Sequence, residues 1–99
     1  MKILLACSAG MSTSLLEKSM NDYIKENGFN DSVEAHASEA AKSIVNNFDV
    51  VLLGPQVRYL KASFEELSKG APIGVIPPHD YALAKGENVY KYAKEVLGK

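Results

Sequence analysis

Cysteine is nearly absent from this sequence, since Cys7 is the only one among 99 residues. One cysteine excludes an internal disulfide, so we expect a reducing compartment. Long apolar runs are also lacking, and none approaches the roughly 20 residues that a membrane-spanning helix needs. The apolar run at the N-terminus follows a single lysine and is too short for a secretory signal peptide. We therefore expect a cytoplasmic protein with no direct membrane insertion.

An excess of charge of one sign is missing too. The 11 basic and 12 acidic residues give a formal net charge of −1, which offers no electrostatic reason to expect nucleic acid as a partner. His, Asp and Glu do not cluster at metal-ligand spacing, so we predict neither a metal site nor a cofactor. The sequence has no repeat, linker or low-complexity segment, and its 99 residues suffice for one hydrophobic core. We predict one domain over residues 1–99.

Four short segments have the pattern of strands. Residues 3–6 and 50–53 are continuously apolar, as is typical of strands that are buried on both faces. Residues 73–76 form a further expected strand, which Pro77-Pro78 ends. Residues 33–37 instead alternate between apolar and polar side chains, the pattern of a strand with one wetter face.

Helical patterns separate and follow these strands. The first begins near residues 12–14, where Ser14 and Glu17 have the spacing of a capping box, and it ends at Gly28. The second has Ser38 as its expected N-cap. The other two cover residues 60–67 and 89–96.

This alternation predicts an α/β fold of the flavodoxin-like or phosphatase-like kind, with a four-stranded parallel sheet and helices on both faces. The apolar first and third strands belong in the centre, and the alternating second strand suits an edge, so the predicted order is 2-1-3-4. The winding then reverses between strands 1 and 3, and ligands bind at such a switch point beyond the carboxyl ends of the strands. The loops expected there are residues 7–13, 54–58 and 77–81.

Cys7 lies at this switch point, between an apolar strand and a helix. A thiol in that place meets unpaired backbone N–H groups and the positive end of the helix dipole, which lower its pKa and favour a bound phosphate. We therefore expect an ionised sulfur that solvent can reach. The residues predicted to bind the phosphate are Ser8, Ala9, Gly10, Met11, Ser12 and Thr13.

The loop lacks one residue that a hydrolase needs. Cysteine-dependent tyrosine phosphatases have an arginine six positions after the cysteine, and here that position is Thr13. Without a guanidinium group to neutralise the phosphoryl oxygens, and without an acid beside the loop to activate water, a phosphoryl group would be held until another acceptor arrives. This favours a phosphoryl carrier.

Two motifs resemble a known family. The segment Cys7–Ser14 after an apolar strand, with Leu53–Tyr59 after the third strand, is similar to the IIB component of the bacterial phosphotransferase system, lactose/cellobiose (chitobiose) class. The resemblance covers the whole chain. It implies that Cys7 is a phosphocysteine, which receives phosphate from a phosphohistidine on a IIA protein and passes it to a sugar bound by a membrane IIC component. Family members have a Tyr-Gly pair after the fourth strand, whereas here Ala82 follows Tyr81.

Further side chains border the expected crevice. Gln56, Arg58 and Tyr81 are candidate contacts to the phosphate or to a partner, while Arg58 is equally explained as an exposed residue in a first helical turn. His79 lies in the third loop, where a solvated turn histidine is the better interpretation. Two other functions remain open on this fold: a small cysteine-dependent phosphatase, and a flavin- or nucleotide-binding module.

Overall fold

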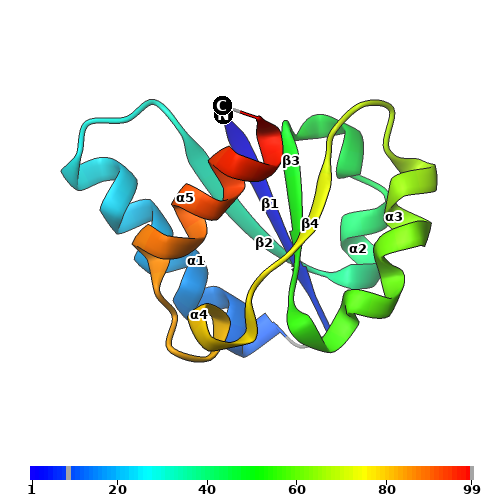
Figure 1. Cartoon of the computed structure of the whole chain (residues 1–99), viewed down its shortest axis with the longest axis horizontal. Coiled ribbons are helices and arrows are strands. Elements are labelled where there is room, and N and C mark those ends of the chain that lie inside the picture. Colours follow the sequence, from blue (N-terminus) through cyan, green and yellow to red (C-terminus); the bar gives the residue numbers. More distant parts are fainter. Residues whose placement is uncertain (9, 99) are drawn as a thin grey trace.

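A parallel sheet separates two layers of helices in the computed structural model, which describes residues 1–8 and 10–98, without the side chains of residues 10–13 (Figure 1). The strands are β1 (Lys2–Cys7), β2 (Ser32–Ala37), β3 (Val50–Leu53) and β4 (Ile73–Val75). All three neighbouring pairs are parallel, and the order is β2-β1-β3-β4. The predicted sheet order is therefore confirmed.

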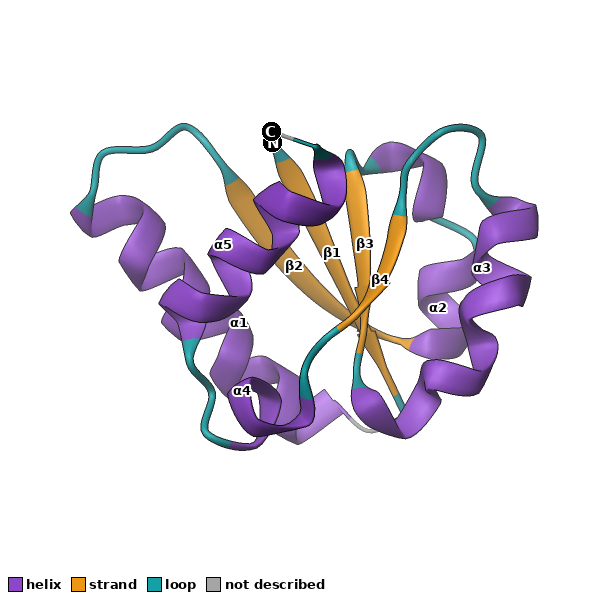
Figure 2. Cartoon of the chain, viewed as in Figure 1, coloured by secondary structure: helices purple, strands orange, loops and turns teal. Residues whose placement is uncertain are grey.

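The helices cover both faces of this sheet, as predicted. Helices α1 and α5 lie on one face, α2 and α3 lie on the other, and α4 lies near the carboxyl ends of the strands (Figure 2). Their bounds, with two 3-10 segments η1 and η2, are α1 (Gly10–Glu26), α2 (Ser38–Lys42), η1 (Val45–Asn47), η2 (Pro55–Leu60), α3 (Lys61–Leu67), α4 (Pro78–Ala82) and α5 (Gly86–Leu97).

Alternate side chains of the central strand β1 enter opposite halves of the core. Ile3 and Leu5 pack in the cluster that includes residues of α1 and α5, whereas Leu4 and Ala6 pack in the cluster that includes Phe64 of α3. Successive side chains of a strand point to opposite faces of the sheet, so a strand covered on both faces must be apolar throughout. The continuous apolar run of β1 thus reflects its central place.

Two predicted helix starts are wrong. Helix α1 begins at Gly10 instead of residues 12–14, and the Glu17 carboxylate accepts a hydrogen bond from the Ala35 N–H of β2 instead of completing a capping box. Ser38 is the first residue of α2, and Ala37 is its N-cap. Helix α2 is also short, because Ile44 has φ −120° and ψ 8° and so leaves the helical region.

The predicted loop over residues 77–81 is mostly helical. Strand β4 ends at Val75, and α4 follows with Pro78 at its start. Proline suits the first helical position because the N–H that it lacks would have no partner there. The Pro77-Pro78 pair therefore both ends the extended segment and begins a helix.

Candidate functional site

Cys7 is the last residue of β1 and lies where the sheet reverses its winding. It pairs with Ala37 of β2, and on the other side the Gly54 N–H donates a hydrogen bond of 2.8 Å to the carbonyl of Ala6. Cys7 therefore stands between the carboxyl ends of the two strands that flank β1. This is the place that the predicted topology assigned to a ligand.

Helix α1 begins three residues after Cys7, at Gly10, and has 17 residues. The first four N–H groups of an α-helix have no acceptor within the helix, and the aligned peptide dipoles place partial positive charge at the same end. The first turn carries no acidic side chain, since its residues are Gly10, Met11, Ser12 and Thr13. An anion beyond Cys7 would meet backbone donors and favourable charge.

The predicted phosphate-binding segment has two structural parts. Ser8 follows β1 and is exposed, while residues 10–13 belong to the first turn of α1 instead of a loop. Ala9 and the side chains of residues 10–13 lie outside the described part of the structure. The description of the segment therefore rests on Ser8 and on the backbone of the first helical turn.

The side chain of Cys7 is buried, with only 1% of its surface exposed. The sequence predicts a sulfur that solvent can reach, and for this conformation that prediction is wrong. The reason is the crowding at the end of β1, where the backbone of Gly54 passes directly beside the cysteine. A Cβ on Gly54 would lie 3.2 Å from the Cβ of Cys7 and 3.3 Å from Cε1 of Tyr81.

Gln56 and Tyr81 both lie beside Gly54, the residue that packs against Cys7. Gln56 Oε1 would lie 2.9 Å from a Cβ on Gly54, and both side chains line a pocket of ≈ 320 Å³ together with Leu15, Ala82 and Ala84. Tyr81 is 7% exposed, so its ring is a fixed part of the pocket lining, whereas Gln56 is exposed to solvent. The structure thus brings two of the three predicted contact residues to the cysteine through Gly54.

The third predicted contact and the two histidines have other surroundings. Arg58 is exposed on η2, two residues beyond Gln56. His79 is exposed on α4, so it is a solvated helix residue and not part of a turn. His36 lies on the edge strand β2, where its Nε2 is 3.2 Å from the carboxylate of Glu34.

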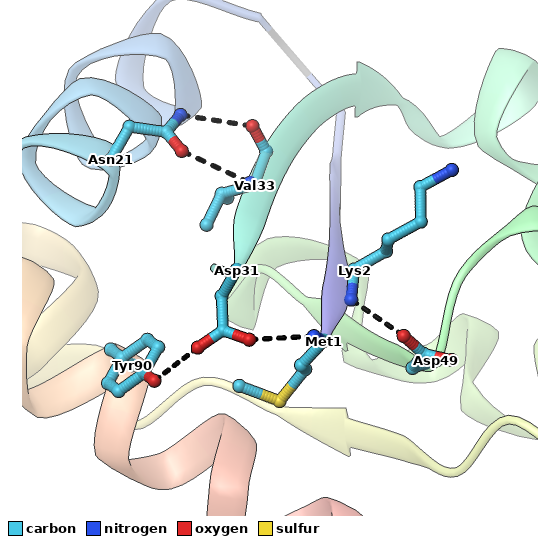
Figure 3. Close-up of polar contacts among 7 residues, drawn as sticks. All are labelled: Met1, Lys2, Asn21, Asp31, Val33, Asp49 and Tyr90. Atoms are coloured by element: carbon cyan, nitrogen blue, oxygen red, sulfur yellow. Dashed lines mark hydrogen bonds and ion pairs between the residues drawn. The ribbon is translucent and has the colours of Figure 1, made fainter. Parts of the chain in front are cut away.

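A second polar cluster lies at the opposite end of the sheet (Figure 3). The Met1 ammonium donates a hydrogen bond of 2.6 Å to the Asp31 carboxylate, which also accepts one from the Tyr90 hydroxyl. Burial, the hydrogen bond with Asp31 and its charge raise the pKa of Tyr90 to about 12. Burial opposes ionisation of Asp31, but hydrogen bonds from the ammonium and from Tyr90 outweigh it and lower the pKa of Asp31.

This cluster borders a pocket of ≈ 400 Å³, which is larger than the ≈ 320 Å³ pocket lined by Gln56 and Tyr81. Its lining residues include Asp31, Asp49 and Tyr90. Asp31 is bonded to the Met1 ammonium and to Tyr90, and Asp49 accepts a hydrogen bond from the Lys2 N–H. These polar groups hold the fold together, so the size of the pocket does not make it the candidate site.

Two residues that line the smaller pocket, Leu15 and Ala84, are not predicted from the sequence. Gly54 belongs to the loop 54–58 that is expected at the switch point, but the sequence does not indicate its close approach to Cys7. Leu15, which is 63% exposed, lies within a helical pattern. Ala84 has a positive φ of 49° and lies after a helix that was not predicted. The apolar Leu15 on a wetter helical face was the one available signal.

The described part of the chain contains neither a candidate metal site nor a candidate membrane-spanning helix. Within it, no three His, Cys, Asp or Glu side chains are grouped so that they could hold a metal ion. The same residues include no helix with the length and apolar character needed to cross a membrane.

Comparison with known proteins gives a consistent result. Residues 2–92 match the family described as "PTS system, Lactose/Cellobiose specific IIB subunit". The chain is 39% identical to the oligo-beta-mannoside-specific EIIB component of Bacillus subtilis, covering 97% of this chain and 95% of the relative. It is 33% identical to the cellobiose-specific EIIB component of Lactococcus lactis, covering 96% of this chain and 94% of the relative.

Two solved structures share the fold. The cellobiose-specific IIB component of Borrelia burgdorferi superposes with a TM-score of 0.80 at 42% identity, covering 99% of this chain and 92% of that one. The lactose-specific IIB domain of Streptococcus pneumoniae gives a TM-score of 0.81 at 22% identity, over 97% and 96% of the two chains, and at that identity it supports the fold alone. Fold, motifs and near full-length similarity agree, and this chain belongs to the lactose/cellobiose-specific IIB subunits of the phosphotransferase system (PTS), a phosphotransferase component.

Proposed function

We propose that this protein is a cytoplasmic phosphoryl carrier in sugar uptake and that residues 1–99 form one IIB domain. Cys7 accepts a phosphoryl group from a phosphohistidine of a IIA protein and passes it to a sugar held by a membrane IIC component. The observation that carries this proposal is the place of Cys7, at the end of the central strand β1 and directly before the first turn of α1. Membership of the PTS IIB family supports it.

In the first transfer the Cys7 thiolate attacks the phosphorus in line with the bond to the histidine nitrogen. The S–P bond forms while the P–N bond breaks, and the imidazole keeps the electron pair. Negative charge spreads over three equatorial oxygens, which the N–H groups of the first turn of α1 would meet. Ser8 and the residues from Ala9 to Thr13 would surround the group, and Gln56 and Tyr81 would border it.

In the second transfer a sugar hydroxyl attacks the same phosphorus. The P–O bond forms, the S–P bond breaks with its electron pair left on the sulfur, and the hydroxyl proton is released to water, which restores the thiolate. The residues from Cys7 to Thr13 include no arginine, and a guanidinium group is the usual means of stabilising a hydrolytic transition state in cysteine phosphatases. Its absence favours a stable phosphocysteine that waits for the sugar.

Burial of Cys7 adds a requirement to this mechanism. With 1% of its surface exposed, the thiolate reaches an incoming phosphohistidine only after the surrounding residues open. We propose that docking of the IIA protein provides this opening at the carboxyl edge of the sheet. A partner can drive such an opening only to the extent that it binds the open state more tightly than the closed state.

We infer the class of the transported sugar from similar proteins. Similar proteins are described as specific for oligo-beta-mannosides, galactose and cellobiose, so we propose a sugar of the β-glucoside, lactose or chitobiose type. The choice among these sugars lies with the IIC partner.

Phosphorylation by a IIA protein tests the proposal. Purified protein is incubated with a phosphorylated IIA protein of this class, and the phosphate is located by peptide mapping. Wild type should carry phosphate on Cys7, and Cys7→Ser should carry none. Unchanged labelling of Cys7→Ser would place the site elsewhere, with His79 examined first. Steady turnover of an aryl phosphate would instead identify a phosphatase, and a coloured, flavin-containing preparation a binding module.

A further inference from the structure

Strand β2 forms one edge of the sheet, and side chains of α1 bond to its outward backbone groups. The Asn21 amide donates to the Val33 carbonyl at 3.0 Å and accepts from the Val33 N–H at 3.1 Å (Figure 3). One helical turn earlier, the Glu17 carboxylate accepts from the Ala35 N–H at 2.7 Å. We call these four residues the α1–β2 clasp. Its bonds take the place of a further strand along part of this edge.

The clasp depends on a match between two spacings. Four residues of an α-helix rise by about 6 Å, and two residues of a β-strand rise by about 6.6 Å. Glu17 and Asn21 are four residues apart, and their partners Ala35 and Val33 are two residues apart. The helix and the strand therefore meet in a single axial register, and sliding α1 by one residue would break the bonds.

The core packing of α1 and its hydrogen bond to α5 fix its place along the sheet less strictly. Leu16, Met20 and Ile24 are buried in the core, but apolar burial has no preferred direction. The Ser19 hydroxyl accepts a hydrogen bond from the Gly86 N–H, which ties α1 to α5 and not to the strands. The clasp ties α1 by directional bonds to the sheet that carries Cys7.

The clasp also lies only a few residues from the candidate site, both along β2 and along α1. Ala35 is two residues before Ala37, the partner of Cys7 in the β1–β2 pairing. Glu17 is seven residues after Gly10, the first residue of α1, which is about two helical turns. The position of the first-turn N–H groups relative to the sulfur therefore follows from the register that the clasp sets.

We propose that Glu17 and Asn21 are positioning residues for phosphoryl transfer at Cys7. They hold α1 at the axial position where its first-turn N–H groups face the sulfur, although neither touches the phosphoryl group. This inference rests on the proposed function of Cys7. It explains two half-buried polar side chains beside the buried face of α1.

The test compares Glu17→Ala with Glu17→Gln. Glutamine keeps an oxygen acceptor for the Ala35 N–H and removes only the charge, whereas alanine removes both. Loss of a nearby negative charge lowers a thiol pKa, while loss of the helix N-terminus raises it, so the two effects have opposite signs. Asp22→Asn is the matched control, because Asp22 accepts a hydrogen bond from Lys18 on the exposed side of the same helix.

The Cys7 thiol is titrated by the ultraviolet absorbance of the thiolate, and phosphoryl acceptance from a IIA protein is timed. Glu17→Ala should have a higher thiol pKa than Glu17→Gln, and it should accept phosphate several-fold more slowly. Glu17→Gln should keep the wild-type transfer rate. Equal thiol pKa values and equal rates in folded Glu17→Ala and Glu17→Gln would overturn the proposal.

Two further measurements separate the possible failures. If Glu17→Ala does not fold, Asn21→Ala replaces it, and a wild-type thiol pKa and transfer rate in that variant would equally overturn the proposal. If wild-type Cys7 takes no phosphate at all, the proposed function fails. The thiol titrations still decide in that case whether the clasp positions α1.

Discussion

Gly54 lies against Cys7 so closely that a Cβ at position 54 would stand 3.2 Å from the Cβ of the cysteine. Gly54 itself has φ −63° and ψ 151°, a backbone conformation open to any residue. The glycine is therefore required by space and not by backbone geometry. It lets β3 leave the sheet beside the cysteine and keeps Gln56 and Tyr81 next to it.

Gly54→Ala should impair transfer at Cys7. The new methyl group must displace the Gln56 side chain and press on Cys7 and the buried Tyr81 ring. We expect a loss of about 1–3 kcal/mol in unfolding free energy, with slower phosphoryl acceptance. Urea unfolding and a IIA transfer assay measure the two effects. Gly28→Ala is the control, because Gly28 has φ +68° and open space around it, so alanine should cost stability but leave transfer unchanged. Normal transfer in Gly54→Ala would contradict this reading.

Gly86→Ala should destabilise the fold more strongly. A Cβ there would lie 2.5 Å from the carbonyl carbon of Ser19 and 2.7 Å from the backbone nitrogen of Met20, so α1 and α5 must separate. We expect a loss of about 3 kcal/mol or more, measured by urea unfolding. Ser19→Ala removes only the hydroxyl that accepts from the Gly86 N–H and should cost about 1 kcal/mol. Similar losses in the two variants would show that the helices separate easily.

Tyr90→Phe should change how stability depends on pH. The raised pKa of Tyr90 stabilises the fold below its ordinary value of 10.0, and this contribution is lost as pH rises from 10.0 to about 12. The lowered pKa of Asp31 stabilises the fold above its ordinary value of 3.8, and this contribution is lost as pH falls below it. The variant should therefore be less stable by about 1–2 kcal/mol near neutrality, with the difference shrinking at both extremes.

Urea unfolding from pH 3 upward, about one unit apart, measures this profile. Tyr92→Phe provides the control, because the Tyr92 hydroxyl accepts a hydrogen bond from the uncharged Val75 N–H. Its stability difference should not shrink at acid pH. A difference for Tyr90→Phe that is flat from acid to alkaline pH would show that the bond to Asp31 does not carry the effect.

Gln56→Ala should slow phosphoryl transfer without loss of stability. Gln56 is exposed and lines a pocket together with Tyr81, and loss of one hydrogen-bond donor to a phosphoryl group should slow transfer by about tenfold or more. Arg58→Ala is matched in element and exposure and should transfer at nearly the wild-type rate. Equal rates for wild type and Gln56→Ala would remove Gln56 from the site.

The order of the strands and the position of the cysteine can be predicted from the sequence, because both depend on local patterns of side chains. Residues 3–6 and 50–53 are apolar without interruption, as central strands that are covered by helices on both faces require. Once the order is set, Cys7 follows from the reversal of winding. Family resemblance then adds the chemistry, which the fold alone does not define.

The parts that the sequence does not predict depend on contacts between distant segments. Glu17 and Asn21 are polar residues on a helix, and their pattern does not distinguish a solvated side chain from one bonded to Ala35 or Val33. The burial of Cys7 likewise follows from the approach of Gly54, which lies 47 positions further along the chain. The sequence does not predict α4, because Pro78 is equally compatible with the end of a strand and with the start of a helix.

A sulfur with 1% exposure is also shielded from peroxide, and sulfenic acid forms mainly on thiolates that solvent reaches. Any motion that admits a phosphoryl donor would admit an oxidant as well. The rate at which Cys7 oxidises in the resting protein therefore reports how often the site opens, and a bound partner that covers the site would both permit transfer and protect the thiol.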